Sequence, residues 1–171
     1  MHALATRRAT AVAGLLAVAV WLGGLLALGA IAAPVVFTVG SMPGAADAMT
    51  IVFQRFDLLA MSCAAVLLAS EAGRALARLP FARLDHVRAG VSVVAAAAAV
   101  LEGTNVSPRI AALHAAGAIR GMGSAGRELA RLHDLAELCG KTQVVLLVAV
   151  VILQVVTLTR PASPPGSAAT G

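Results

Sequence analysis

From residue 9 to residue 37 the chain reads ATAVAGLLAVAVWLGGLLALGAIAAPVVF, a stretch of 29 residues without a charged side chain. As a helix rising about 1.5 Å per residue, it would be roughly 43 Å long. The hydrocarbon core of a bilayer is about 30 Å thick and needs about 20 apolar residues to cross. The stretch therefore predicts a transmembrane helix at about residues 10–33, between Arg8 and Pro34.

Three further apolar stretches follow, at about residues 56–78, 87–103 and 142–160. The uncharged cores of the second and third, residues 58–70 and 89–101, are short enough to suit re-entrant segments as well. We expect full spans, because the aliphatic stems of the four arginines between them can reach the headgroups, and Leu79-Pro80-Phe81 breaks the helix. The sequence predicts an all-α, polytopic four-helix transmembrane bundle in a single domain, residues 1–160.

The first stretch also has features of a cleaved signal peptide. Arg7 and Arg8 resemble the basic start of such a peptide, and Ala30-Ile31-Ala32 matches an A-x-A cleavage site. Hydrophobic regions of signal peptides are only about 7–15 residues long. We therefore expect the first span to remain in the mature protein.

Small residues recur four apart in the first span, as in Ala19, Gly23 and Ala27. Such spacing lets two helices approach closely in lipid and predicts a homo-oligomer joined through this span; the alternative is that Gly and Ala are merely abundant. Trp21 lies near the middle of the span, and a buried indole N–H needs a partner. We expect Trp21 to face another helix.

Residues 104–141 are too polar to span but show helical patterns. Ser107-Pro108 is typical of a helix start, with an N-cap serine and a proline in the first turn. Three glycines then interrupt the helix: Gly121, Gly123 and Gly126.

A second, amphipathic helix is predicted from near Ala125. Its apolar stripe consists of Leu129, Leu132, Leu135 or Ala136, and Cys139. Pairs such as Glu128 with Arg131 would support it weakly. We expect this helix to lie on the membrane surface or pack on the bundle, and to turn near Gly140 into the fourth span.

Composition agrees with a membrane protein, because 60% of the residues are hydrophobic and 12% charged, against about 25% charged in soluble domains. The arginines sit in short clusters beside apolar stretches, where positive charge orients a membrane protein. The net charge of +5 therefore does not indicate nucleic acid, and the lipid bilayer is the expected partner. The tail, residues 161–171, holds only Pro, Ala, Ser, Gly and Thr and is predicted to be disordered.

The excess of arginine over lysine and the many alanines are typical of a GC-rich bacterial genome. We therefore expect a multi-pass protein of the bacterial inner membrane. The first helix and the short basic connection between the second and third spans favour cytoplasmic N- and C-termini.

No catalytic motif is present: the sequence lacks a P-loop, GxGxxG, HExxH and GxSxG. Cys63 and Cys139 form no CxxC pair, and no two of His86, His114 and His133 lie three or four residues apart. We expect no catalytic residue, no cofactor and no metal ligand set.

Ionisable residues near membrane depth are the remaining candidates, because such groups are costly in lipid and tend to be functional or paired. Glu71 and Glu102 adjoin the apolar cores of the second and third spans. Both are expected near the interface, and Glu71 can pair with Arg74, three residues on.

Several short motifs resemble a four-span membrane family related to transmembrane protein 205. They are Trp21-Leu22-Gly23-Gly24, Ala33-Pro34-Val35-Val36-Phe37, Ile51-Val52-Phe53-Gln54-Arg55-Phe56-Asp57, Ser107-Pro108-Arg109-Ile110 and Arg131-Leu132-His133-Asp134-Leu135. The family is uncharacterised, so the resemblance implies a four-helix membrane fold and no activity. It adds Pro34, Arg55, Asp57, Pro108 and His133 to Trp21, Glu71 and Glu102 as candidate functional residues.

Three functional hypotheses follow. The preferred one is a non-catalytic scaffold or accessory protein. The second is a metal- or drug-handling permease in which Trp21, Glu71 and Glu102 line a path. The third is a copper- or haem-linked redox protein that uses His86, His114 or His133.

Reporter fusions test the predicted topology. Fusions after Gly44, Arg83, Gly121 and Gly166 are expected to report alternating sides of the membrane, with Arg83 and Gly166 cytoplasmic, because one predicted span lies between each site and the next. The same side for Gly44 and Arg83 would show that the second segment is re-entrant.

Overall fold

The computed structural model describes residues 2–76 and 83–159, and within these ranges the chain is helical without a strand. The elements are α1 (His2–Ala27), η1 (Leu28–Ala32, π-helical), α2 (Ala33–Val39), α3 (Met42–Leu76), α4 (Arg83–Leu101), η2 (Glu102–Val106, π-helical), α5 (Ser107–Ala115) and α6 (Gly123–Thr159). The predicted break at Leu79-Pro80-Phe81 and the tail lie outside the described residues.

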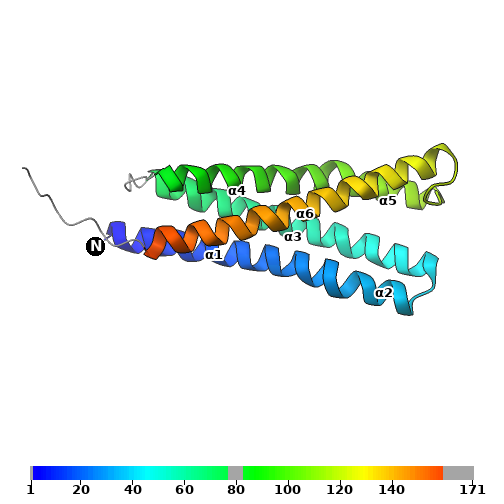
Figure 1. The fold of residues 1–171 in the computed structure, drawn as a ribbon, viewed down its shortest axis with the longest axis horizontal. Coiled ribbons are helices and arrows are strands. Elements are labelled where there is room, and N and C mark those ends of the chain that lie inside the picture. The colour runs from blue at the N-terminus through cyan, green and yellow to red at the C-terminus, as the bar shows by residue number, and fades with distance from the viewer. Residues whose placement is uncertain (1, 77–82, 160–171) are drawn as a thin grey trace, which may run out of the picture.

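These elements form four long rods in an antiparallel bundle (Figure 1). α1 packs on α3, α3 on α4, α4 on α6, and α6 on α1, so the rods close into a ring. The start of α1, the end of α3, the start of α4 and the end of α6 lie at one end, called here the terminal end. The opposite end holds the α2–α3 and α5–α6 turns and is called the turn end.

Four helical segments among the described residues are long and apolar enough to cross a membrane: Arg8–Val39, Gly44–Leu76, Arg83–Ala115 and Gly123–Thr157. The all-α fold with four membrane-spanning helices is therefore confirmed. The helices are longer than the predicted spans, and α3 begins at Met42, well before residue 56.

The bundle core is built from small and aliphatic side chains with one tryptophan, among them Val18, Trp21, Leu67, Ala95, Leu147 and Val150. Gly24 of α1 lets the Phe56 ring of α3 approach, since a Cβ at Gly24 would lie 2.4 Å from that ring. Large aliphatic side chains such as Leu16, Val94 and Ile152 are more than half exposed on the outer surface. An apolar exterior of this kind suits lipid rather than water.

Pro34 does not end the helix, which corrects one prediction. α5 begins at Ser107 with Pro108 in its first turn, as predicted, but it continues directly from η2. The chain stays helical through Pro34, and the N-cap residue of α5 is Val106 rather than the predicted Ser107, without a side-chain cap hydrogen bond. A proline ring clashes with the carbonyl four residues earlier. Here those residues, Ala30 and Thr104, lie in η1 and η2, where the wider π turn takes up the clash.

Gly140 does not turn the chain either, since α6 runs unbroken from the amphipathic segment into the fourth span. A glycine inside a helix costs only about 1 kcal/mol, and the Glu137–Lys141 ion pair spans this turn of the helix. The reversal between α5 and α6 instead uses Gly117, Gly121 and Gly123, all with positive φ. Gly126, predicted as an interruption, lies within α6.

The amphipathic part of α6 packs on α5, one of the two arrangements that we expected. Leu129 is fully buried with Val106 and Ile110, and Leu132 and Ala136 pack against them. Ala136 rather than Leu135 completes the stripe, because Leu135 is 38% exposed.

The charged pairs of this segment differ from those predicted within the helix. Glu128 pairs with Arg109 of α5, and Asp134 pairs with Arg120 of the turn. Both carboxylates therefore pair with arginines that precede α6 in the chain, and these ion pairs help to hold α6 against α5 and the turn.

Because this segment packs on α5, alanine substitutions at two leucines of α6 should differ clearly in their effect on stability. Leu129→Ala should lower the free energy of unfolding in detergent by about 2–5 kcal/mol, since it leaves a cavity at a fully buried site. Leu138→Ala is the matched control, because Leu138 is 61% exposed. Equal melting temperatures for the two variants would show that the segment is not docked in solution.

Candidate functional site

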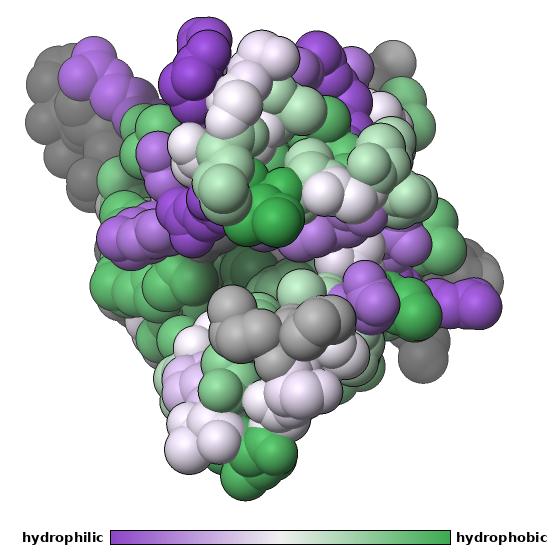
Figure 2. Space-filling model, turned by 90° about the vertical axis from the view of Figure 1, so that its right-hand side faces the viewer, coloured by the Kyte–Doolittle hydropathy of each residue, from purple (hydrophilic) through white to green (hydrophobic). Residues whose placement is uncertain are grey.

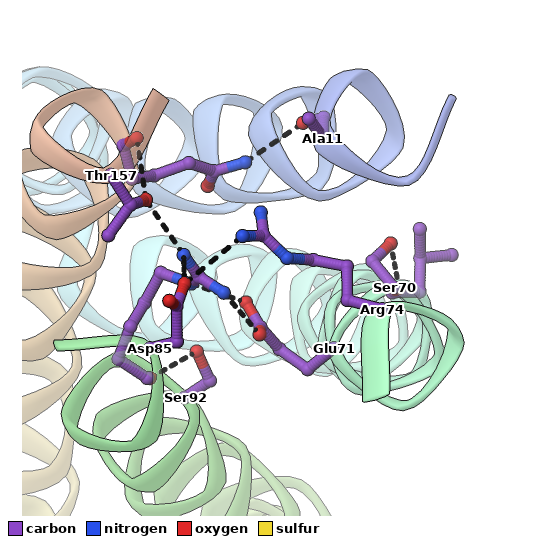
Figure 3. Close-up of polar contacts among 10 residues, drawn as sticks. Ala11, Ser70, Glu71, Arg74, Asp85, Ser92 and Thr157 are labelled. Carbon is purple, nitrogen blue, oxygen red and sulfur yellow. Dashed lines mark hydrogen bonds and ion pairs between the residues drawn. The ribbon is translucent and has the colours of Figure 1, made fainter. Parts of the chain in front are cut away.

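Arg88 is fully buried near the start of α4, in a cluster of polar side chains at the terminal end. Figure 3 labels Glu71, Arg74, Asp85 and Thr157 of this cluster. Its guanidinium donates two hydrogen bonds of 2.7 Å to the Glu71 carboxylate and one of 3.0 Å to Asp85 Oδ1. Arg74 also reaches Asp85 Oδ1, at 3.1 Å. We call Glu71, Arg74, Asp85, Arg88 and Thr157 the Arg88 cluster.

The cluster corrects two expectations about α3 and α4. Arg74 and Arg88 were expected to extend to the headgroups, but both are buried. Glu71 was expected to pair with Arg74, but it forms an ion pair with Arg88 of the neighbouring helix. Two cations and two anions give the cluster no net charge, and a two-pronged arginine–carboxylate contact is the geometry that best offsets the loss of water.

The cluster also connects helices. Arg88 Nη1 donates to the Thr157 hydroxyl at 2.9 Å, and that hydroxyl donates to the Gln154 carbonyl. The Gln154 side chain donates to the Ala11 carbonyl of α1 at 2.9 Å. Hydrogen bonds thus run from α3 and α4 through α6 to α1 (Figure 3).

A second polar group lies inside the bundle, away from the Arg88 cluster in sequence. Trp21 Nε1 donates to Gln143 Oε1 at 3.0 Å, and Gln143 Nε2 donates to Glu102 Oε2 at 2.6 Å. Trp21 therefore faces another helix, as predicted. Gln143 was missed, although a glutamine in an otherwise apolar span is itself a signal, since its amide must find partners in lipid.

Asp57 of α3 lies beside Glu102. A Cβ built on Gly103, the next residue, would lie 3.2 Å from the Asp57 Cβ, and the two carboxyl groups interact electrostatically. The Ser107 side chain lies near the Asp57 carboxyl group, and Asp57 Oδ2 is buried without a hydrogen-bond partner in the described part of the chain. We call Trp21, Asp57, Glu102, Ser107 and Gln143 the Glu102 group.

A groove of about 1060 Å³ opens beside the Glu102 group toward the turn end. Its walls come from α1, η1, α2 and α3 on one side and from η2, α5 and α6 on the other. Figure 2 views the molecule from this end and shows the hollow, with hydrophobic surface inside and hydrophilic side chains mainly above it. Glu102 and Ser107 are the members of the Glu102 group that line it.

The structure brings together some of the predicted residues and separates others. Glu102 and His133 line the groove, and Trp21 and Asp57 lie behind Glu102. Glu71 belongs to the Arg88 cluster instead, and Arg55 is exposed on α3. Pro34 and Pro108 follow η1 and η2, two segments that contribute Gly29, Ala30 and Glu102 to the groove. The functional roles of all these residues stay predictions.

Two of the three candidate histidines, His114 and His133, lie close together in the lining of the groove. The rings of His114 and His133 have centroids 5.7 Å apart and are tilted by 60°. His86 is exposed near the start of α4, at the terminal end. Within residues 2–76 and 83–159, no group of three or more His, Cys, Asp or Glu side chains is placed to hold a metal ion.

These features define a multi-pass helical membrane protein with an ion-paired terminal end and a groove at its turn end. A family model described as Domain of unknown function (DUF4149) matches residues 16–118, more than half of the chain. The chain belongs to this family. The matched residues include Trp21, Arg88 and Glu102 but stop before α6, which supplies Gln143. Neither a curated protein nor a solved structure matches the chain.

The Arg88 cluster predicts a strong and partly reversible loss of stability. Arg88→Gln should destabilise the protein by about 3–5 kcal/mol, because it leaves the Glu71 carboxylate buried and unpaired. Adding Glu71→Gln should restore part of that loss by removing the orphaned charge.

Arg109→Gln serves as the control for loss of an arginine, since the Arg109–Glu128 pair is exposed and such pairs contribute about 0–1 kcal/mol. Thermal unfolding in detergent measures all three variants. A double variant no more stable than Arg88→Gln would contradict the pairing.

Proposed function

We propose that this protein is a small accessory protein of the membrane that binds a hydrophobic molecule in the groove. The observation that carries the proposal is the groove itself. Its volume of about 1060 Å³ is slightly above the roughly 300–1,000 Å³ that small-molecule sites occupy. It is therefore large enough for a drug-sized or lipid-like compound.

The lining supports binding by burial of apolar surface. Leu25 of α1, Met49 and Phe53 of α3, and Val144 of α6 face the groove. Apolar walls with a few placed polar groups are the common composition of such sites.

The rim supports entry from the bilayer. Leu26 of α1 and Val145 of α6 line the groove and are also 50% and 68% exposed. Because the outer surface of these helices is apolar, a molecule dissolved in lipid meets the groove without first crossing water.

A permease is the second candidate, and the observation that favours it is the acidic Glu102 on the groove wall. The path that we first hypothesised, through Trp21, Glu102 and Glu71, requires one change. Glu71 is held by Arg88 in a separate cluster, so transport past it needs that cluster to open.

We also propose the finer features that the sequence predicts. A homo-oligomer is supported by exposed Ala19, Gly23 and Ala27 on one stripe of α1. Residence in a bacterial inner membrane with cytoplasmic termini rests on the charge and composition patterns. Kinship with the transmembrane protein 205 family rests on the short motifs from Trp21 to His133.

Filling the groove tests the proposed function. Gly140 lines the groove, and a Cβ there meets no atom within 4 Å, so Gly140→Phe places a ring in the groove without a clash at the backbone. Triphenylphosphine oxide, a neutral hydrophobic probe, should bind the wild-type protein saturably in equilibrium dialysis against matched empty micelles. Gly140→Phe should weaken this binding at least about tenfold, because the ring occupies the same space.

Gly90→Phe is the control, since Gly90 also has open space around it but lies outside the groove. It should bind the probe like the wild-type protein. Full binding by Gly140→Phe, or no saturable binding at all, would refute the proposal.

A further inference from the structure

We infer that the groove selects lipophilic cations, with Glu102 as the contacting anion and Asp57 as a second carboxylate behind it. The class is a monovalent cation on a hydrophobic body, such as a quaternary ammonium, a phosphonium or a protonated amine. This inference rests on the proposed function, because it names the ligand chemistry of the same groove.

Some charged side chains on the groove wall have an oppositely charged partner, and one does not. Lys141 pairs with Glu137, and Arg120 pairs with Asp134. Glu102 instead accepts a hydrogen bond from Gln143, a neutral amide, and forms no ion pair in the described part of the chain. Among the acidic side chains lining the groove, Glu102 is thus the one whose charge the described residues leave uncompensated.

Asp57 adds a second negative charge that favours binding of a cation beside Glu102. It is 7% exposed, its Oδ2 has no hydrogen-bond partner among the described residues, and it interacts electrostatically with Glu102. Two neighbouring carboxylates away from water repel each other and lose hydration, so a positive charge beside Glu102 relieves both. The neighbouring side chains Ser107 and Gln143 are neutral, so the hydrogen bond that Gln143 donates to Glu102 brings no counter-charge.

The shape of the site favours a large organic cation over a bare metal ion. The groove is roomy and its inner wall carries Leu25 and Val144, which offer no ligand to a metal. Within the described ranges, no three His, Cys, Asp or Glu side chains converge on a metal position. A hydrophobic body fills the apolar walls while its charge reaches Glu102.

The protein carries its own reporter of this event. Trp21 is the single tryptophan of the chain, and its indole N–H is joined to Glu102 through Gln143. A cation that attracts the Glu102 carboxylate shifts this hydrogen-bonded chain. Its binding should therefore change the Trp21 emission.

Tetraphenylphosphonium and tetraphenylborate test the inference, since they match in shape and differ in the sign of their charge. In nonionic micelles, with empty micelles subtracted, the wild-type protein should bind the phosphonium at least about tenfold more tightly than the borate, with a change in Trp21 emission. This comparison needs no variant, so it stands even if a substitution impairs folding. Equal affinities, or tighter binding of the borate, would overturn the inference.

Variants then locate the charge. Glu102→Gln should weaken tetraphenylphosphonium binding at least about tenfold and change triphenylphosphine oxide binding less than about twofold, because only the charge is removed. Asp57→Asn should weaken the phosphonium less than Glu102→Gln does. Glu128→Gln makes the same change of charge outside the groove and should leave the phosphonium affinity as it was.

The outcomes separate this inference from the proposed function. Saturable binding of triphenylphosphine oxide without preference for the phosphonium leaves the hydrophobic groove and rejects the cation site. Phosphonium binding that Glu102→Gln does not alter also rejects it. Absence of binding by all three probes refutes both.

Discussion

The Arg88 guanidinium is the contact on which the arrangement of the helices depends. A fully buried arginine in an apolar bundle has to meet carboxylates, because leaving its charge unpaired costs far more than any single packing contact provides. Glu71 from α3 and Asp85 from its own helix supply them, and Thr157 ties the group to α6. The terminal end of the bundle is therefore held by polar bonds that lipid cannot replace.

The turn end is held differently. There the small cluster of Val106, Ile110 and Leu129 joins α5 to α6 through apolar contacts. The α1–α2 rod diverges from α6 toward this end (Figure 1), and the groove lies in the space between them. One end of the molecule is thus held by buried ion pairs, whereas the other end has exposed ion pairs and contains the groove.

The membrane-spanning character could be predicted because it depends on the length and hydropathy of each stretch, which are local properties. Trp21 and Glu102 were found for a similar reason, since a polar atom at membrane depth must be satisfied wherever the chain goes. The partners could not be found in this way. Arg88 is 17 residues from Glu71 and Gln143 is 122 residues from Trp21, and such pairings depend on which face of each helix points inward.

The hydrophobic pattern of this sequence gives little indication of which face of each helix points into the bundle. Helices surrounded by lipid are apolar on their outer side as well as their inner side, so the periodic pattern that orients a helix in water is weak. Without this information, the spacing of three residues predicts a pair of Glu71 with Arg74, whereas Glu71 pairs with Arg88 of α4. Likewise, proline predicts a helix end in most contexts, and the π segments that accommodate Pro34 and Pro108 leave no obvious signature in the residues before them.

The two π segments also set the rotational phase of everything that follows them. A π turn holds one residue more than an α turn, so it rotates the later side chains by roughly 100° about the helix axis. His114 and Ile110 lie after η2, and Phe37 lies after η1. The direction in which each of these side chains points therefore depends on the extra residue in the π segment before it. Loss of a single residue from either segment would turn a different set of side chains toward the groove while leaving the composition of the helix almost unchanged.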